Sequence, residues 1–263
     1  MHSLENMRSE FSKIDRLTIR NIALARAGNF WLGREAQLEV NIERIILEIQ
    51  DLEEAAGAMN LPLSFDETKK IKAIWVISGA GTYFQPITNT AGDLIYKDKA
   101  WAHFSDHDRI SYASEIVKKI GLLASAKSLP GPYLIYDGIE EQNEDLISAV
   151  ESHEIMIPKS ALFIPKGRIL KTLDQVKYFE LPADLNIQNG DVIGVVSHAP
   201  HLARVMRMVN KYKPFPKGVK VKLLPLVFTG NKNEKEFAQA EITGILDYIS
   251  KGEATEESYP YEL

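Results

Sequence analysis

The sequence predicts a doubly wound α/β fold, in which a mainly parallel sheet carries helices on both faces. From residue 71 onward, short apolar runs alternate with longer segments whose apolar residues recur at helical spacing. This alternation is typical of strands joined by crossover helices, which makes neighbouring strands parallel. Polar or glycine-rich turns follow the apolar runs, and in a parallel sheet such turns share one edge.

The segment before the sheet, residues 3–59, is charged and is predicted to form two or more helices. Its clearest helix gathers apolar residues on one face, namely Leu38, Ile42, Ile45, Ile46, Ile49 and Leu52. Asn60-Leu61-Pro62 ends this helix, because proline cannot continue a helix interior and restricts the residue before it.

The strands of the sheet are predicted at Ile71–Ile77, 132–136, 161–164, 192–196 and 219–228. Helices are predicted at 108–126, 142–153, 172–179 and 198–212, and a C-terminal helix at Glu234–Ser250. We therefore expect an N-terminal helical segment (1–66), a Rossmann-like three-layer domain (67–252) and an acidic tail (253–263) that is mobile or lightly tethered. The stretch 79–107 shows no periodicity and is long enough for a lid, a binding loop or a small subdomain.

The composition of this 263-residue chain argues against several classes of protein. The net charge is −5 and the 31 basic residues are scattered, unlike those of a nonspecific nucleic-acid-binding protein. Cysteine is absent, which excludes a disulfide framework, a thiolate metal site and a cysteine nucleophile. No apolar run approaches the ~18 residues of a membrane helix, and the polar start is unlike a secretory signal. We expect a cytoplasmic protein with a small-molecule ligand and without membrane or nucleic-acid partners, with the oligomeric state, including a homodimer, left open.

Polar groups follow the predicted strands and should converge on one cleft at the carboxyl edge of the sheet. The candidate ligand-binding residues in these turns are Ser78, Gly79, Ala80, Gly81, Thr82, Asp137, Gly138, Glu140, Lys166, Gly167, Thr172, Ser197, His198, His201 and Arg204. The turn SHAPHLAR at 197–204 is the most informative, because it stands where a buried strand meets an amphipathic helix.

Several of these residues have a structural alternative. The glycine turn at 79–81 either presents N–H groups to an anion or is a tight turn, and Phe84 stands where the dinucleotide fingerprint needs its third glycine. Asp106 or Asp108 is either a helix N-cap or, with His107, part of a metal site, and no second ligand cluster accompanies them, so no metal is predicted. His198 and His201 either face a ligand, cap the following helix or hydrogen-bond to a loop.

Two further kinds of chemistry concern the same cleft. Basic residues would attract phosphate or carboxylate, or are solvated surface charges; they are Lys166, Arg168, Lys171 and Arg204. A Ser-His-acid triad is not predicted, because Ser197 lacks the G-x-S-x-G nucleophile elbow.

Five motifs occur in a fixed order over about residues 74–252: WVISGAG, DRISYASEI, Asp137-Gly138, KGRILKTLDQ and SHAPHLAR. In this order they resemble the SanA/ElyC/YdcF family, and the closing EITGILDYISKGE is similar to the last helix of its YdcF branch. The resemblance adds Asp108, Arg109 and Gln175 to the candidate ligand-binding residues. The chain departs from the family where Lys166, Ile169 and Lys171 replace Glu, Ser and Asn, which changes one wall from acidic to basic.

The resemblance implies S-adenosylmethionine as the ligand of the cleft. Asp137, Glu140 or Glu141 would then accept hydrogen bonds from ribose hydroxyls, and Arg109 or Arg204 would hold the methionine carboxylate. Methyl transfer is the reaction implied, and the candidate catalytic residues are His201, as general base, and Asp108. Two alternatives remain: a hydrolase or transferase acting on a phosphorylated small molecule, and a non-catalytic sensor or scaffold.

Overall fold

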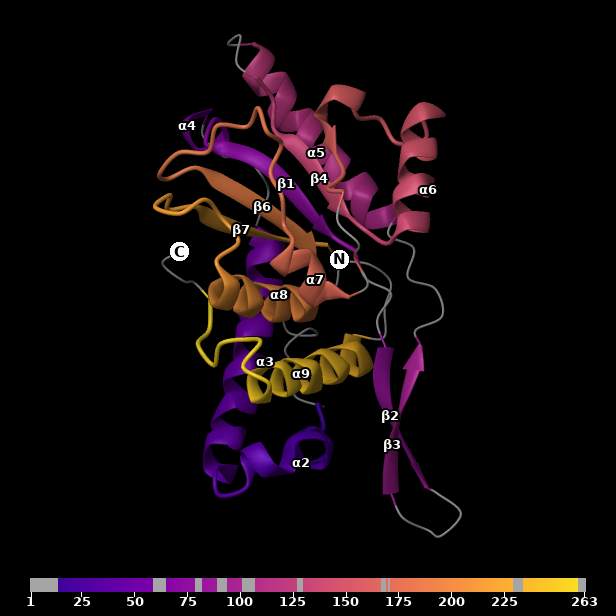
Figure 1. Ribbon diagram of the computed structural model, residues 1–263, viewed down its shortest axis with the longest axis vertical. Helices are drawn as coiled ribbons and strands as arrows, with labels where there is room; N and C mark the ends of the chain where they lie inside the picture. The colour runs from indigo at the N-terminus through magenta and orange to yellow at the C-terminus, as the bar shows by residue number, and fades with distance from the viewer. Residues whose placement is uncertain are drawn as a thin grey trace.

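A computed structural model describes residues 14–58, 65–78, 82–88, 94–100, 107–126, 130–166, 169, 171–228 and 234–259 (Figure 1). Its main sheet contains β1 (Ile71–Ile77), β4 (Tyr133–Asp137), β5 (Leu162–Phe163), β6 (Val192–Ser197) and β7 (Lys222–Val227). The strand order is β5-β4-β1-β6-β7 and every pair is parallel. The chain builds the sheet outward from β1 to β5, then returns to add β6 and β7 on the other side. The predicted doubly wound α/β fold is confirmed.

The helices cover both faces of this sheet (Figure 1). α5 (His107–Ser125) and α6 (Glu140–Glu151) lie on one face, and α7 (Thr172–Lys177) and α8 (Ala199–Tyr212) lie on the other. α3 (Glu35–Ala58) and α9 (Glu234–Ser250) pack outside α8, and α2 (Arg16–Trp31) packs on both of them. The short α4 (Phe65–Thr68) precedes β1. No helix in the described part of the chain is long and apolar enough to cross a membrane.

Most predicted bounds agree with the structure within a few residues, and two strands are shorter for local reasons. β5 begins at Leu162 because a 3₁₀ turn, Lys159–Ala161, occupies the residues before it. β7 begins at Lys222, because residues before it form a turn closed by a hydrogen bond from Val219 N–H to the Pro216 carbonyl. The predicted strands were therefore too long, because the neighbouring turns also contain apolar residues.

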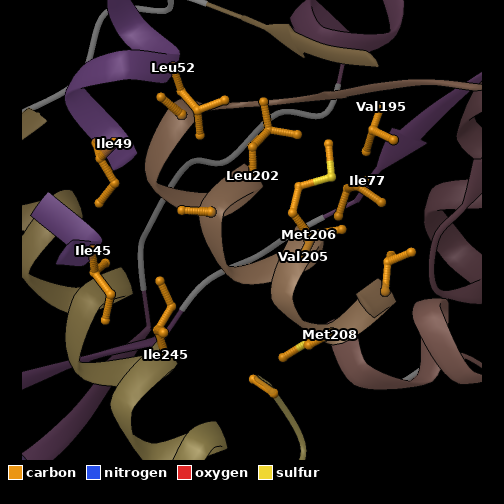
Figure 2. Packing of buried hydrophobic residues seen from close by; sticks show 14 of the residues in the cluster. Ile45, Ile49, Leu52, Ile77, Val195, Leu202, Val205, Met206, Met208 and Ile245 are labelled. Carbon is orange, nitrogen blue, oxygen red and sulfur yellow. The ribbon is translucent and has the colours of Figure 1, made fainter. Parts of the chain in front are cut away.

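α8 is buried between the sheet and α3, which explains its content of large apolar residues. Figure 2 shows Ile77 and Val195 of the sheet on one side of this helix and Ile45, Ile49 and Leu52 of α3 on the other. Every residue of the predicted apolar face of α3 is buried. The N-terminal helices thus share one hydrophobic core with the α/β domain.

The chain end is docked as far as Tyr259, which corrects the expectation of a loosely held tail. The Glu256 carboxylate accepts hydrogen bonds from Arg34, Gln37 and Asn41. The Tyr259 hydroxyl donates to a main-chain carbonyl of β7 at 2.9 Å. The expectation was wrong because the composition shows only that the tail is acidic. It does not show that hydrogen-bond donors at and near the start of α3 lie opposite Glu256.

The stretch at 79–107, which showed no periodicity in the sequence analysis, contains an antiparallel hairpin. β2 (Thr82–Thr88) pairs with β3 (Leu94–Ala100), and only the backbone of these strands is described. β2 contacts α9, so the hairpin lies beside the helical layer and away from the parallel sheet (Figure 1).

Candidate functional site

The ends of β1, β4 and β6 lie side by side at the carboxyl edge of the sheet, as predicted. Ser78 follows β1, Asp137 ends β4 and Ser197 ends β6. Ile77, the last residue of β1, is the register partner of Asp137. The strand order reverses between β1 and β6, and open α/β sheets bind ligands at such a point.

Arg109, near the start of α5, holds the ends of β1 and β6 together. Its Nη1 donates to the Ile77 carbonyl at 2.8 Å and lies 3.4 Å from Ser197 Oγ. Burial lowers the pKa of this guanidinium to about 10, so it remains charged at neutral pH. These contacts give Arg109 a structural role at the strand ends; its predicted contact with a ligand carboxylate stays a prediction.

Ser78 connects β1, β4 and α7. Its hydroxyl donates to the Asp137 carbonyl at 2.9 Å. The amide Nε2 of Gln175, in α7, donates to the Ser78 carbonyl at 3.1 Å and to Ser78 Oγ at 2.5 Å. Because a carbonyl oxygen only accepts hydrogen bonds, Nε2 must face Ser78, and the orientation of the Gln175 amide is fixed.

Asp137 carries a buried carboxyl group that lacks hydrogen-bond donors. The residue is 0 % exposed, and neither Oδ1 nor Oδ2 has a partner among the described residues. Burial, with smaller contributions from the negative charges of Glu180 and Asp174, raises the pKa of this carboxyl to about 7. The Oε1 atom of Gln175 is likewise buried without a hydrogen-bond partner in the described part of the chain. Buried acceptors in this condition are rare in folded proteins and require an explanation.

His201 lies between two hydroxyl groups on the other side of the strand ends. Its Nδ1 is 3.2 Å from Ser197 Oγ and its Nε2 is 3.3 Å from Thr172 Oγ1. Arg204 Nη2 donates to the same Thr172 hydroxyl at 3.2 Å, and Arg204 Nε lies 3.1 Å from a carboxylate oxygen of Glu241. The structure thus brings together the predicted His201, Thr172 and Arg204. The positive charge of Arg204 is balanced by Glu241 of α9.

His198 is packed in an aromatic environment. Its ring meets those of Phe228 and Phe237 edge-on, with centroid distances of 5.1 and 5.6 Å. It occupies the N-cap position of α8, but its side chain makes no capping hydrogen bond. The prediction that the His198 side chain caps α8 is therefore wrong.

The remaining candidates lie at the margin of the site or outside the described residues. Glu140 and Lys166 are exposed, and the main chain of Gly138 is bonded to Asn143. Asp108 is the second residue of α5, not the residue before it, and only its backbone is described, as for Thr82. Four predicted site residues fall outside the described part of the chain: Gly79, Ala80, Gly81 and Gly167.

Sequence reasoning missed Glu241, which neutralises Arg204. This residue is buried on the inner face of α9, beside Ala238, Ile242 and Ile245. An acidic residue among apolar residues at helical spacing was a usable signal, because a buried carboxylate requires a partner. Its partner lies on another helix and leaves no local pattern.

The described cavities lie elsewhere. Volumes of about 510 and 400 Å³ open at the amino edge of the sheet, around Gly131 and Tyr133, and no predicted site residue lines them. Asp137 ends β4 at the opposite, carboxyl edge and is buried. No three Asp, Glu or His side chains are grouped as metal ligands among the described residues.

Comparison with known proteins adds no identification. No protein-family model, curated protein or solved structure matches the chain. The resemblance to the SanA/ElyC/YdcF family therefore stays a prediction that rests on the motifs.

Proposed function

We propose that the chain binds a nucleoside-like small molecule of the S-adenosylmethionine type at the ends of β1, β4 and β6. The observation that carries this proposal is the Asp137 carboxyl, which is buried at the carboxyl edge without a donor among the described residues. An unsatisfied buried acceptor costs about 1–3 kcal/mol. A group that persists at such a cost is expected to contact a ligand that supplies the missing donors.

The position of Asp137 supports this class of ligand. In dinucleotide-binding α/β folds, a glycine-rich turn follows the first strand, and an acidic residue further along binds the ribose. Here the SGAG sequence follows β1, and Asp137 ends β4, which pairs directly with β1. An adenosyl ligand with an amino-acid end carries hydroxyl and ammonium donors, which are the groups that Asp137 and Gln175 lack.

Methyl transfer is the reaction proposed for this site, with His201 as the group that handles a proton. Both ring nitrogens of His201 lie within hydrogen-bonding distance of hydroxyls, from Ser197 and Thr172. Hydroxyls can donate or accept, so they can stabilise either tautomer of the imidazole. A ligand hydroxyl or amine that displaced one of them would face a correctly oriented base.

The phosphate alternative has less support. It depends on a set of basic side chains, of which Lys166 and Lys171 are exposed and Arg204 is paired with Glu241. The Asp137 and Gln175 oxygens are acceptors, whereas a phosphate group would require donors.

Thermal-shift measurements test the binding proposal. The purified chain is heated with S-adenosylmethionine, S-adenosylhomocysteine, nucleotides and sugar phosphates in parallel. A ligand at 100-fold excess over its Kd should add about 2.7 kcal/mol to the free energy of unfolding. A shift with the adenosyl compounds supports the proposal, and a shift with phosphate compounds alone overturns it.

A second measurement separates an enzyme from a sensor. His201→Ala should still bind S-adenosylmethionine but should lose conversion to S-adenosylhomocysteine in the presence of small-molecule acceptors. The conversion is followed by mass spectrometry. Wild-type protein that binds the ligand and converts none of it would favour the non-catalytic alternative.

A further inference from the structure

The site contains three hydrogen-bond acceptors that have no donor among the described residues. They are Asp137 Oδ1, Asp137 Oδ2 and Gln175 Oε1. Both residues are held at Ser78, Gln175 through its side-chain amide and Asp137 through its main-chain carbonyl. Because Nε2 of Gln175 is fixed on Ser78, the amide cannot rotate to offer a donor in place of Oε1. With the Asp137 carboxyl ionised, this part of the site can only accept hydrogen bonds.

The charges that act most strongly on the Asp137 carboxyl are negative. After burial itself, the largest contributions come from Glu180 and Asp174. Asp174 is at the start of α7, where its carboxylate accepts from the Lys171 N–H at 3.2 Å. A cation placed at Asp137 would therefore be attracted by three carboxylates.

The donors of the ligand can be matched to this environment. A hydroxyl offers one donor and brings two lone pairs that need donors of their own. A phosphate or carboxylate group brings only acceptors. A primary ammonium has three donors, no acceptor and a positive charge, so it matches three acceptors in a negative field.

We propose that Asp137 and Gln175 bind the ammonium group of an amino-acid-bearing ligand. This rests on the proposed function and changes one detail of it, because Asp137 then contacts the amino-acid end of the ligand and not the ribose. The site thus selects ligands by their amino group.

Titration calorimetry with two adenosyl compounds tests this selection. S-adenosylhomocysteine carries the ammonium, whereas 5′-methylthioadenosine keeps adenine and ribose but lacks the amino-acid end. Wild-type protein should bind S-adenosylhomocysteine ~tenfold more tightly or better, the range expected for a hydrogen bond to a charged group. Asp137→Asn should reduce this ratio towards one, and the matched control Asp145→Asn, an exposed residue of α6, should preserve it. Equal affinity of the wild type for the two compounds would overturn the inference while leaving adenosyl binding intact.

If no adenosyl compound binds, the proposed function is wrong, and the ammonium site is then tested separately with two simple cations. Ethylammonium has N–H donors and a charge, whereas tetramethylammonium has the charge alone. Ethylammonium chloride should raise the melting temperature of the wild type above that in tetramethylammonium chloride, and Asp137→Asn should abolish the difference. Identical melting temperatures for the wild type in the two salts would overturn the ammonium site.

Discussion

Two buried carboxyl groups of this protein are in opposite situations. Glu48 of α3 forms an ion pair with the buried Arg207 of α8 and accepts a hydrogen bond from the Tyr259 N–H at 3.2 Å. Asp137 of β4 is buried as deeply but has no hydrogen-bond partner among the described residues. Where burial of a charge serves the fold, the chain supplies both a countercharge and donors. Asp137 has no such donors among the described residues, and this is the observation from which we propose that it contacts a ligand.

The largest expected effect comes from breaking the pair that serves the fold. Arg207→Met leaves Glu48 buried without its countercharge, which should lower the free energy of unfolding by about 3–5 kcal/mol. Arg20→Met, which breaks the exposed pair with Glu39, should lose less than about 1 kcal/mol. Urea denaturation of the two variants measures the difference. Equal losses would show that the buried pair is no more important than a surface pair.

The second prediction concerns Asp137, whose contribution to the free energy of unfolding should depend on pH. The pKa of Asp137 is raised from 3.8 to about 7 in the folded state, so the folded protein holds a proton that the unfolded chain releases. The wild type should therefore lose stability as pH rises from about 4 to about 7, by up to about 4 kcal/mol. Asp137→Asn should remove this loss.

Urea denaturation at pH 5 and pH 8 checks this prediction. The difference between Asp137→Asn and the wild type should shift in favour of the variant at pH 8. Asp51→Asn, which changes an exposed carboxyl of α3, is the control and should show no such shift. A variant that is relatively less stable at pH 8 than at pH 5 would mean that the Asp137 carboxylate has a partner in the folded protein.

A smaller effect is expected where the chain end docks. Glu256→Gln removes the charge that Arg34 and two amides contact, and should lower stability by about 1–2 kcal/mol. Glu257→Gln is the neighbouring control, because Glu257 is exposed. Chemical denaturation measures the free energy of unfolding of both variants. Equal values would mean that Glu256 does not hold the tail in place, as the sequence analysis expected.

A last pair of variants tests how tightly the chain beside Asp137 is packed. A Cβ atom on Gly138 would lie 2.7 Å from the Tyr136 ring, so Gly138→Ala should cost about 1–3 kcal/mol. A Cβ on Gly121, in α5, would meet no atom within 4 Å, so Gly121→Ala should stabilise the helix by up to about 1 kcal/mol. The two melting temperatures should move in opposite directions. A higher melting temperature for both variants would show that the end of β4 can shift to make room for the added methyl group.

The fold could be predicted because its signals are local. Buried strands such as IKAIWVI and the apolar face of α3 appear as periodic patterns in the sequence. The hairpin of β2 and β3 was missed because neither strand sequence, TYFQPIT or LIYKDKA, shows a long apolar run or strict alternation. The docking of Glu256 on Arg34 was missed because its partners are far apart in the sequence.

The convergence of the candidate residues could be predicted, but their contacts could not. Strand ends in a parallel sheet must converge, so Ser78, Asp137 and Ser197 were found from the order of elements alone. The pairing of Arg204 with Glu241 depends on how α8 packs on α9, which no local pattern specifies. The lack of partners at Asp137 is a property of the folded arrangement and has no counterpart in the sequence.

The most direct test of the account is to follow the Asp137 carboxyl by ¹³C NMR, with Asp137→Asn to assign its signal. Without ligand, the signal should titrate near pH 7, as expected for a buried carboxyl with a pKa of about 7. With saturating S-adenosylhomocysteine, the carboxyl should remain ionised well below pH 7, because a bound ammonium favours the charged form. Titration near pH 4 in the free protein, or a signal unchanged by a bound ligand, would contradict the claim that the Asp137 carboxyl lacks partners in the free protein and binds the ligand.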